Sequence, residues 1–222
     1  MASKSRIARI YVLAGTNGAG KSSIGGAMLV SQGVPYFNPD EAAARIRVAN
    51  PGLSLAEAQS AAWLEGQRLL ERAIEEGLDY AFETTLGGKT ISTLLAEAAS
   101  QGIEVRIWYV GLASADLNVA RVKSRVAHGG HDIPEGKIRE RYARSLLNLI
   151  RLLPFATEVR VYDNSHDADP NSGLAPKLEL IVHIKKGRIV ASNALAATPA
   201  WAKPIMLEAL KISESTKTRQ KP

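Results

Sequence analysis

The sequence predicts an α/β fold of three layers, in which a mostly parallel sheet carries helices on both faces. Short runs of β-forming residues alternate with helical stretches through the first 111 residues, which is the pattern of repeated β-α-β units. The first run, Ile7 to Leu13, is apolar along most of its length and does not alternate, as expected of a strand buried on both faces. Gly15 follows it, and a helical stretch comes next.

The elements expected over the first half follow in order along the chain. They are a helix at 21–32 ended by Gly33, a short strand at 35–38, two helical stretches within 41–77 separated at 50–52, a strand at 79–84, a helix at 89–101 and a strand at 104–111. The second helical stretch opens at Ser54 with Glu57 three residues on, which is capping-box spacing.

After Gly111 the character of the chain changes. Two Arg-rich helices are expected at 114–128 and 134–153, and together they resemble a helical hairpin or lid. Further strands are expected at 158–162 and 178–184, joined by a polar loop, with a tight turn at 185–188. The main domain is therefore expected to span 1–191, with the lid at about 114–153, and 192–222 to form a C-terminal helix and a basic, partly disordered tail.

Composition excludes several classes of protein. The 222 residues contain no cysteine, which rules out a disulfide framework, a thiolate metal site and a cysteine nucleophile. The apolar run near the start, Ile10 to Ala14, is too short for a signal peptide, and no run approaches the roughly 18 apolar residues that span a bilayer. A cytoplasmic protein is expected, and no membrane partner. The net charge of +6 is compatible with nucleic acid, acidic lipid or a phosphorylated ligand.

The most specific motif is the segment GTNGAGKS at 15–22, which fits the phosphate loop pattern G-x-x-x-x-G-K-[ST]. In such a loop the backbone N–H groups and the N-terminus of the next helix hold a polyphosphate. Lys21 is expected to reach the β and γ phosphates, and the Ser22 hydroxyl to ligate Mg²⁺. The residues expected to bind the nucleotide are Gly15, Asn17, Gly18, Ala19, Gly20, Lys21, Ser22 and Ser23.

Carboxylates follow two strands of the predicted sheet, at the edge where ligands of α/β proteins bind. Asp40 comes after the second strand and could accept a proton from an attacking hydroxyl, although an Asp after Pro39 could equally cap a helix that begins at Glu41. Glu83 ends the third strand, with Thr85 two residues on, and the two could orient a substrate hydroxyl or a metal-bound water. The alternative for Glu83 is a solvated strand end.

The fourth strand has no carboxylate at its end, which disfavours a mechanochemical ATPase. The lid segment is instead rich in positive charge, and such groups above a phosphate loop can stabilise a phosphoryl group in transfer. A solvated basic helix face is the alternative for any one of them. The eight basic residues are Arg121, Lys123, Arg125, Lys137, Arg139, Arg141, Arg144 and Arg151.

Two histidines and one tryptophan are further candidate ligands. His128 and His131 flank a glycine pair, but too few ligands stand nearby for a metal site, so His131 is a phosphate contact or a loop residue. Trp63 falls in the amphipathic stretch from Leu55 to Glu76, where an aromatic residue is more often core than a ligand platform.

Taken together, GTNGAGKS at 15–22, NPDE at 38–41, FETTL at 82–86 and the stretch at 121–146 resemble the zeta toxin family of kinases. The resemblance implies a phosphate-loop kinase fold and ATP-dependent phosphorylation, in the best-known members of the 3′-hydroxyl of UDP-N-acetylglucosamine. It implies that Lys21 is the phosphate-loop lysine, Asp40 the base, Glu83 and Thr85 contacts to the sugar nucleotide, and Arg125 the first of two arginines on the γ-phosphate. It also implies an antitoxin protein as a partner.

The sequence departs from the family pattern at two places. His131 stands where the second arginine is expected before the helix-opening proline, so either His131 takes that role or Arg139, Arg141 or Arg144 reaches in. The arginine that toxins use on the substrate after Thr85 is also missing.

The sequence therefore predicts an ATP:Mg²⁺ phosphotransferase acting on a hydroxyl of a small phosphorylated or nucleotide-linked acceptor. Lys21, Asp40 and Arg125 are the expected catalytic residues, and Arg121, His131, Arg141 and Arg144 further candidates for γ-phosphate contact. A nucleoside or polynucleotide 5′-kinase is the enzymatic alternative. A nucleotide-switched or nucleic-acid-binding module is the non-enzymatic one, disfavoured because no base-stacking or groove-reading motif is present.

Overall fold

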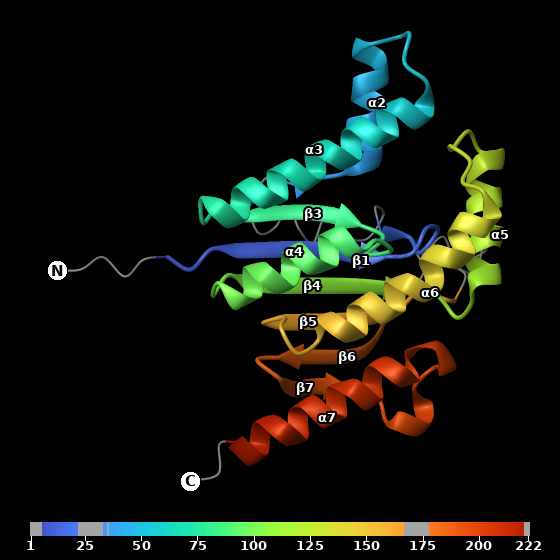
Figure 1. Ribbon diagram of the computed structural model, residues 1–222. Helices are drawn as coiled ribbons and strands as arrows, with labels where there is room; N and C mark the ends of the chain where they lie inside the picture. The colour runs from blue at the N-terminus through green and yellow to red at the C-terminus, as the bar shows by residue number, and fades with distance from the viewer. Residues whose placement is uncertain (1–5, 22–32, 35, 167–177, 220–222) are drawn as a thin grey trace.

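The computed structural model describes residues 6–21, 33–34, 36–166 and 178–219. Its centre is a sheet with the strand order β2-β3-β1-β4-β5-β6-β7 (Figure 1). The strands are β1 (Arg9–Gly15), β2 (Tyr36–Phe37), β3 (Tyr80–Thr84), β4 (Glu104–Gly111), β5 (Glu158–Asp163), β6 (Glu179–Lys185) and β7 (Arg188–Ser192). The helix expected over 21–32, and with it Ser22 and Ser23, lies outside the described residues apart from Lys21.

The first five strands pair in parallel, and β6 and β7 continue the sheet antiparallel. The carboxyl ends of β1, β3 and β4 therefore meet at one edge, because Ala14 is in register with both Thr84 and Tyr109. The prediction of a mostly parallel sheet is confirmed. The antiparallel pair β6–β7 is joined by the tight turn expected at 185–188.

The described helices are α2 (Pro39–Ala49), α3 (Leu55–Glu75), α4 (Lys89–Ser100), α5 (Ala115–Ala127), α6 (Glu135–Leu152) and α7 (Lys203–Arg219), with short 3-10 turns at Leu195–Ala197 and Ala200–Ala202. Figure 1 shows α3, α4, α6 and α7 side by side on one face of the sheet, and α5 beyond its carboxyl edge. The helix α7 extends to Arg219, into the segment expected to be a tail.

The main core lies between the sheet and these four helices. Alternate strand residues such as Ile10, Val12 and Ile107 point into it and pack on Leu95 of α4 and Leu149 of α6. The opposite face of the sheet has a smaller cluster built on Leu13, Ala81 and Trp108. Both faces of the central strands are therefore apolar, which explains why their sequences do not alternate between apolar and polar residues.

Candidate active site

The loop after β1 has the backbone of a phosphate loop. Gly15, Gly18 and Gly20 all have positive φ, at 145°, 78° and 83°, and glycine adopts such conformations without the steric cost of a side chain. At Gly15 a side chain is also excluded by space, because a Cβ atom there would lie 2.2 Å from the carbonyl oxygen of Val110. The motif glycines thus bring the loop against the end of β4 and leave its inner surface to backbone groups.

Two buried asparagines hold this loop from distant elements. Asn118 of α5 donates from Nδ2 to Oγ1 of Thr16 at 2.6 Å and also to the carbonyl oxygen of Asn17. Asn164, just after β5, donates from Nδ2 to the carbonyl oxygen of Ala19 at 2.9 Å. Both pairs join residues more than 100 positions apart. No local sequence pattern marks either asparagine as part of the site.

Lys21 is buried and lies beside a buried carboxylate. Its Nζ donates to the carbonyl oxygen of Thr16 at 3.1 Å and is 3.6 Å from Oε1 of Glu83. Burial lowers the pKa of Lys21, while the carboxylates of Glu83 and Asp40 act in the opposite direction and Arg125 adds to the lowering. The charges expected to meet at this edge of the sheet therefore act on one another.

Glu83 is only 8% exposed, so its reading as a solvated strand end is wrong. Its second carboxylate oxygen, Oε2, accepts a hydrogen bond of 2.9 Å from the hydroxyl of Tyr36 in β2. Burial and the adjacent Glu83 raise the pKa of Tyr36, which keeps this phenol protonated and donating. Lys21 and Tyr36 thus fix Glu83 from two sides.

Asp40 is an exposed residue in the first turn of α2. The helix begins at Pro39, and its N-cap is Asn38, whose Oδ1 accepts from the backbone N–H groups of Asp40 at 2.9 Å and Glu41 at 3.4 Å. The reading of Asp40 as a cap for a helix beginning at Glu41 is therefore wrong. The carboxylate is left to face the cavity described next.

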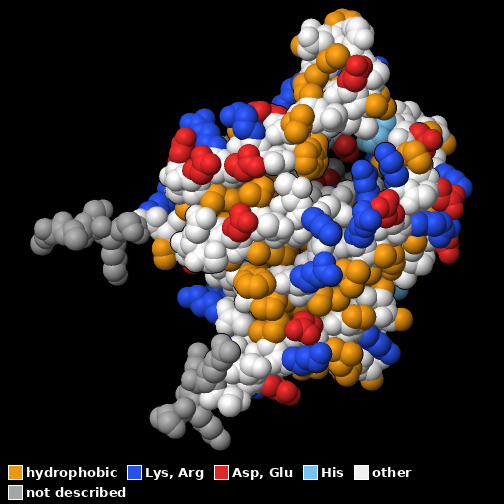
Figure 2. Space-filling model, viewed as in Figure 1, with side chains coloured by type: hydrophobic (Ala, Val, Ile, Leu, Met, Phe, Trp, Pro, Cys, Tyr) orange, Lys and Arg blue, Asp and Glu red, His pale blue; other side chains and the backbone are white. Residues whose placement is uncertain are grey.

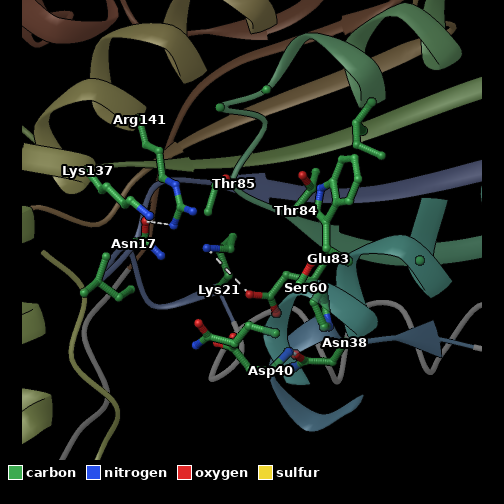
Figure 3. Close-up of a pocket in the computed structure, with 18 of the residues that line it drawn as sticks. Asn17, Lys21, Asn38, Asp40, Ser60, Glu83, Thr84, Thr85, Lys137 and Arg141 are labelled. Atoms are coloured by element: carbon green, nitrogen blue, oxygen red, sulfur yellow. Dashed lines mark hydrogen bonds and ion pairs between the residues drawn. The ribbon is translucent and has the colours of Figure 1, made fainter. Parts of the chain in front are cut away.

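A cavity of about 590 Å³ lies over the carboxyl edge of the sheet. Figure 2 shows it as a hollow between the helices α2 and α3 and the helices α5 and α6. In Figure 3, Lys21 and Glu83 point toward each other inside it, and Arg141 reaches Asn17 from the other side. Eight predicted site residues line it: Asn17, Lys21, Asp40, Glu83, Thr85, His131, Arg141 and Arg144.

Two of the lid arginines predicted to contact the γ-phosphate, Arg121 and Arg125, do not line this cavity. Arg125 donates from Nη2 to the carbonyl oxygen of His131 at 3.1 Å, and its buried Nε has no hydrogen-bond partner among the described residues. Arg121 lies on the other side of the phosphate loop, within 3.5 Å of the carbonyl oxygen of His166. A Cβ atom at Gly18 would lie 3.3 Å from the Cβ of Arg121, so this helix packs closely on the loop.

The three candidates for the second arginine have different surroundings. Arg139 is held outside the cavity by Asp116 at 2.6 Å and Glu135 at 2.9 Å. Arg144 lines the cavity but pairs with Glu140 at 2.5 Å. Arg141 lines it and donates from Nη1 to Oδ1 of Asn17 in the phosphate loop, at 3.3 Å.

The helix α6 is also fastened to the loop that follows β3. Ser145 donates to the carbonyl oxygen of Thr85 at 2.7 Å, and Asn148 donates to those of Leu86 at 2.8 Å and Gly88 at 3.1 Å. The hydroxyl of Tyr109 donates to Ser145, at 3.0 Å. Leu86 has a φ of 54°, unusual for a residue with a side chain, and these contacts support the loop in that conformation.

The described residues contain neither a cluster of metal-binding side chains nor a membrane-spanning helix. No group of three or more His, Asp or Glu side chains that could hold a metal ion occurs among them. Across the same residues, no helix has the length and apolar character needed to cross a membrane.

Comparison with known proteins gives the following similarities. An uncharacterized protein of Haemophilus influenzae is 32% identical over 128 residues, which are 58% of this chain and 88% of that protein. The PezAT chromosomal toxin–antitoxin system of Streptococcus pneumoniae has a chain that superimposes with a TM-score of 0.56 at 13% identity, covering 99% of this chain and 90% of its own. The AvrRxo1-ORF1:-ORF2 structure with ATP superimposes with a TM-score of 0.56 at 14% identity, covering 88% of this chain and 65% of its own.

The structural similarities establish the fold, which is the mixed α/β fold of phosphate-loop kinases. A putative kinase of Chloroflexus aurantiacus has the same fold, with a TM-score of 0.50 at 16% identity over 62% of this chain and 78% of its own. The zeta toxin family model matches residues 3–169. Because this match covers most of the chain, the chain belongs to the zeta toxin family.

Proposed function

We propose that this protein transfers the γ-phosphoryl group of ATP to a hydroxyl of a small acceptor bound in the cavity. The observation that carries the proposal is that Lys21, at the end of the phosphate loop, and Asp40 line one cavity and interact electrostatically. The glycine backbone of the loop and the buried Lys21 fit a polyphosphate. Mg²⁺, held by Ser22, would supply further charge neutralisation when bound.

The transfer assigns one task to each side chain. The carboxylate of Asp40 accepts the proton of the acceptor hydroxyl as that oxygen bonds to the γ-phosphorus. The bond from the γ-phosphorus to the bridging oxygen breaks, and ADP leaves with the electron pair. Lys21 stabilises the charge on the phosphates, and Glu83, fixed by Tyr36, keeps Lys21 in place. Thr85 offers its hydroxyl to the acceptor.

We assign the role of the second lid arginine to Arg141. Of the four candidates, His131 included, it is the one that both lines the cavity and has a hydrogen bond to the phosphate loop among the described residues. Gly87 permits this approach, since a Cβ atom there would lie 3.0 Å from Cγ of Arg141. Arg125 would act after a rotation away from His131, because its guanidinium lies outside the cavity lining in this structure.

Replacement of Asp40 by Ala tests the proposal. Loss of the base should lower kcat at least about 100-fold and leave ATP affinity nearly unchanged. Glu41→Ala is the matched control, because Glu41 lies in the same helical turn but does not line the cavity. Phosphate transfer by the Asp40→Ala protein at the wild-type rate would exclude Asp40 as the base.

We also propose that the acceptor is linked to a nucleotide. A nucleotide-linked sugar such as UDP-N-acetylglucosamine suits a cavity that has cationic side chains on one wall. The toxin–antitoxin structure among the structural neighbours suggests an antitoxin partner for this chain too. Labelled ATP offered in parallel with a UDP-sugar and an oligonucleotide distinguishes the proposal from a 5′-kinase activity.

A further inference from the structure

The cavity has two walls of different chemistry. The wall formed by α6 presents the charged side chains of Lys137, Glu140, Arg141 and Arg144. The wall formed by α3, which we call the α3 wall, presents Gln59, Ser60, Trp63, Gly66 and Gln67, all of them uncharged. A ligand that spans the cavity therefore meets cations at one side and a neutral surface at the other.

Trp63 is the largest side chain of the α3 wall. It is 46% exposed, whereas Trp108 and Trp201, the other two tryptophans, are 7% and 8% exposed. The expectation that Trp63 belongs to the core is therefore wrong. Its neighbour Leu64 is 57% exposed as well but does not line the cavity, so exposure alone does not place a residue at this wall.

The rest of the wall is held in place. Phe37 of β2, which also lines the cavity, packs so closely on α3 that a Cβ atom at Gly66 would lie 2.7 Å from its ring. Gln67 donates from Nε2 to Oε1 of Glu71 at 2.7 Å, which leaves its amide oxygen as the acceptor on this wall. The α3 wall thus combines aromatic rings with amide and hydroxyl groups that can bond to the edge of a planar ring.

We infer that the α3 wall binds the nucleobase of the acceptor, with the ring of Trp63 stacked on the base. The inference rests on the proposed function, since it takes the acceptor to be nucleotide-linked. Stacking on aromatic side chains contributes to base binding and tolerates any base, while amides select among them. A base on the α3 wall would place the attached phosphates toward Lys137, Arg141 and Arg144, and the volume of about 590 Å³ is within the range of small-molecule sites.

Tryptophan fluorescence and calorimetry test this without any transfer reaction. The full-length protein, saturated with a non-hydrolysable ATP analogue to fill the donor site, is titrated with the 5′-monophosphates of uridine, cytidine, guanosine and adenosine. At least one of them should change the emission, because Trp63 is the tryptophan with a large exposed surface. N-acetylglucosamine 1-phosphate, which has a sugar and a phosphate but no base, should leave the emission unchanged.

Three variants separate stacking from folding. Trp63→Ala should bind that nucleotide roughly tenfold more weakly, or worse, and Trp63→Phe within a few-fold of the wild type, both measured by calorimetry. Leu64→Ala, on the same helix but outside the cavity, should bind as the wild type does. Far-UV circular dichroism establishes that all three variants are folded.

The inference is overturned if none of the four nucleotides binds, if the sugar phosphate changes the emission as a nucleotide does, or if Trp63→Ala binds with wild-type affinity. Its failure is distinguishable from that of the proposed function. An acceptor phosphorylated by Trp63→Ala with an unchanged KM overturns the base site and leaves phosphoryl transfer standing. Nucleotide binding that depends on Trp63, without transfer to any acceptor, supports the base site and overturns phosphoryl transfer.

Discussion

At the scale of single residues, neighbouring side chains hold both the buried carboxylate and the phosphate loop of the site in place. Glu83 is fixed between Lys21 and Tyr36, and the phosphate loop is held by Asn118 and Asn164. Because the loop is supported from two other elements, its backbone is in position before any ligand binds. Such preorganisation is what makes electrostatic stabilisation effective in catalysis.

Arg141 and Arg139 provide a matched pair on one helix. Replacement of Arg141 by Ala should lower kcat about 100-fold, because a cation contacting the phosphate loop at Asn17 is lost from the cavity. Arg139→Ala removes an equal charge that is bound to Asp116 and Glu135, and should leave kcat within twofold of the wild type. Steady-state kinetics with ATP and the acceptor measures both. Equal reductions of kcat by the two substitutions would show that kcat depends only on net charge, and would contradict the role assigned to Arg141.

Part of the site could be predicted from single residues and part could not. The phosphate loop is a local motif, and Asp40 and Glu83 follow from the rule that parallel strands end at one edge. The role of Asn38 as N-cap could have been found from Pro39, since proline favours the first position of a helix. Tyr36 could not have been found, because its contact with Glu83 joins residues 47 positions apart.

At the scale of elements, α6 links the two halves of the site. It carries Arg141 toward the phosphate loop, while Ser145 and Asn148, on later turns, hold the loop that follows β3. That loop positions Thr85. A movement of α6 would therefore displace Arg141, proposed to contact ATP, and Thr85, proposed to contact the acceptor, together.

Ser145→Ala tests this link. The change leaves the carbonyl oxygen of Thr85 and the hydroxyl of Tyr109 without a partner inside the protein, which should lower the free energy of unfolding by about 1–3 kcal/mol. It should also lower kcat/KM for the acceptor. Ser92→Ala is the control, since Ser92 is exposed and bonds to carbonyl groups of its own helical turn. Urea unfolding measures stability. Equal midpoints for the two variants would show that the hydrogen bonds of Ser145 do not stabilise the loop that follows β3.

The bounds of most elements were predicted to within a few residues, because glycines and capping residues mark the ends of helices. The strand at Glu104–Gly111 has the predicted bounds. The orientation of Trp63 was not predictable, because the periodicity of a helix identifies an apolar face but not whether that face meets a core or a cavity.

At the scale of the whole molecule, four buried or half-buried tyrosines make stability depend on alkaline pH. Burial raises the pKa of Tyr36, Tyr80, Tyr109 and Tyr142. Below about pH 10 these phenols are protonated in both the folded and the unfolded chain, so their contribution to stability is fully present. Above it, the unfolded chain loses these protons first, and the contribution falls as pH rises. Burial lowers the pKa of Lys21, so the contribution of Lys21 to the free energy of unfolding rises with pH. This is one group against the four tyrosines.

The free energy of unfolding should therefore decrease as the pH rises above about 10. Titration of phenolate absorbance should show Tyr36, Tyr80, Tyr109 and Tyr142 ionising together with unfolding and not before it. Circular dichroism at each pH monitors the fold. Ionisation of these four tyrosines near pH 10 in a chain that stays folded would show that burial does not raise their pKa.

A transfer assay tests most directly whether ATP and an acceptor hydroxyl react in this one cavity. The wild-type protein and the Asp40→Ala variant are incubated with γ-labelled ATP, Mg²⁺ and a metabolite extract, and mass spectrometry identifies each species that gains a phosphate. We expect the wild type, and not the variant, to phosphorylate one small, hydroxyl-bearing acceptor. Release of labelled inorganic phosphate with no phosphorylated acceptor, equally by both proteins, would contradict this expectation.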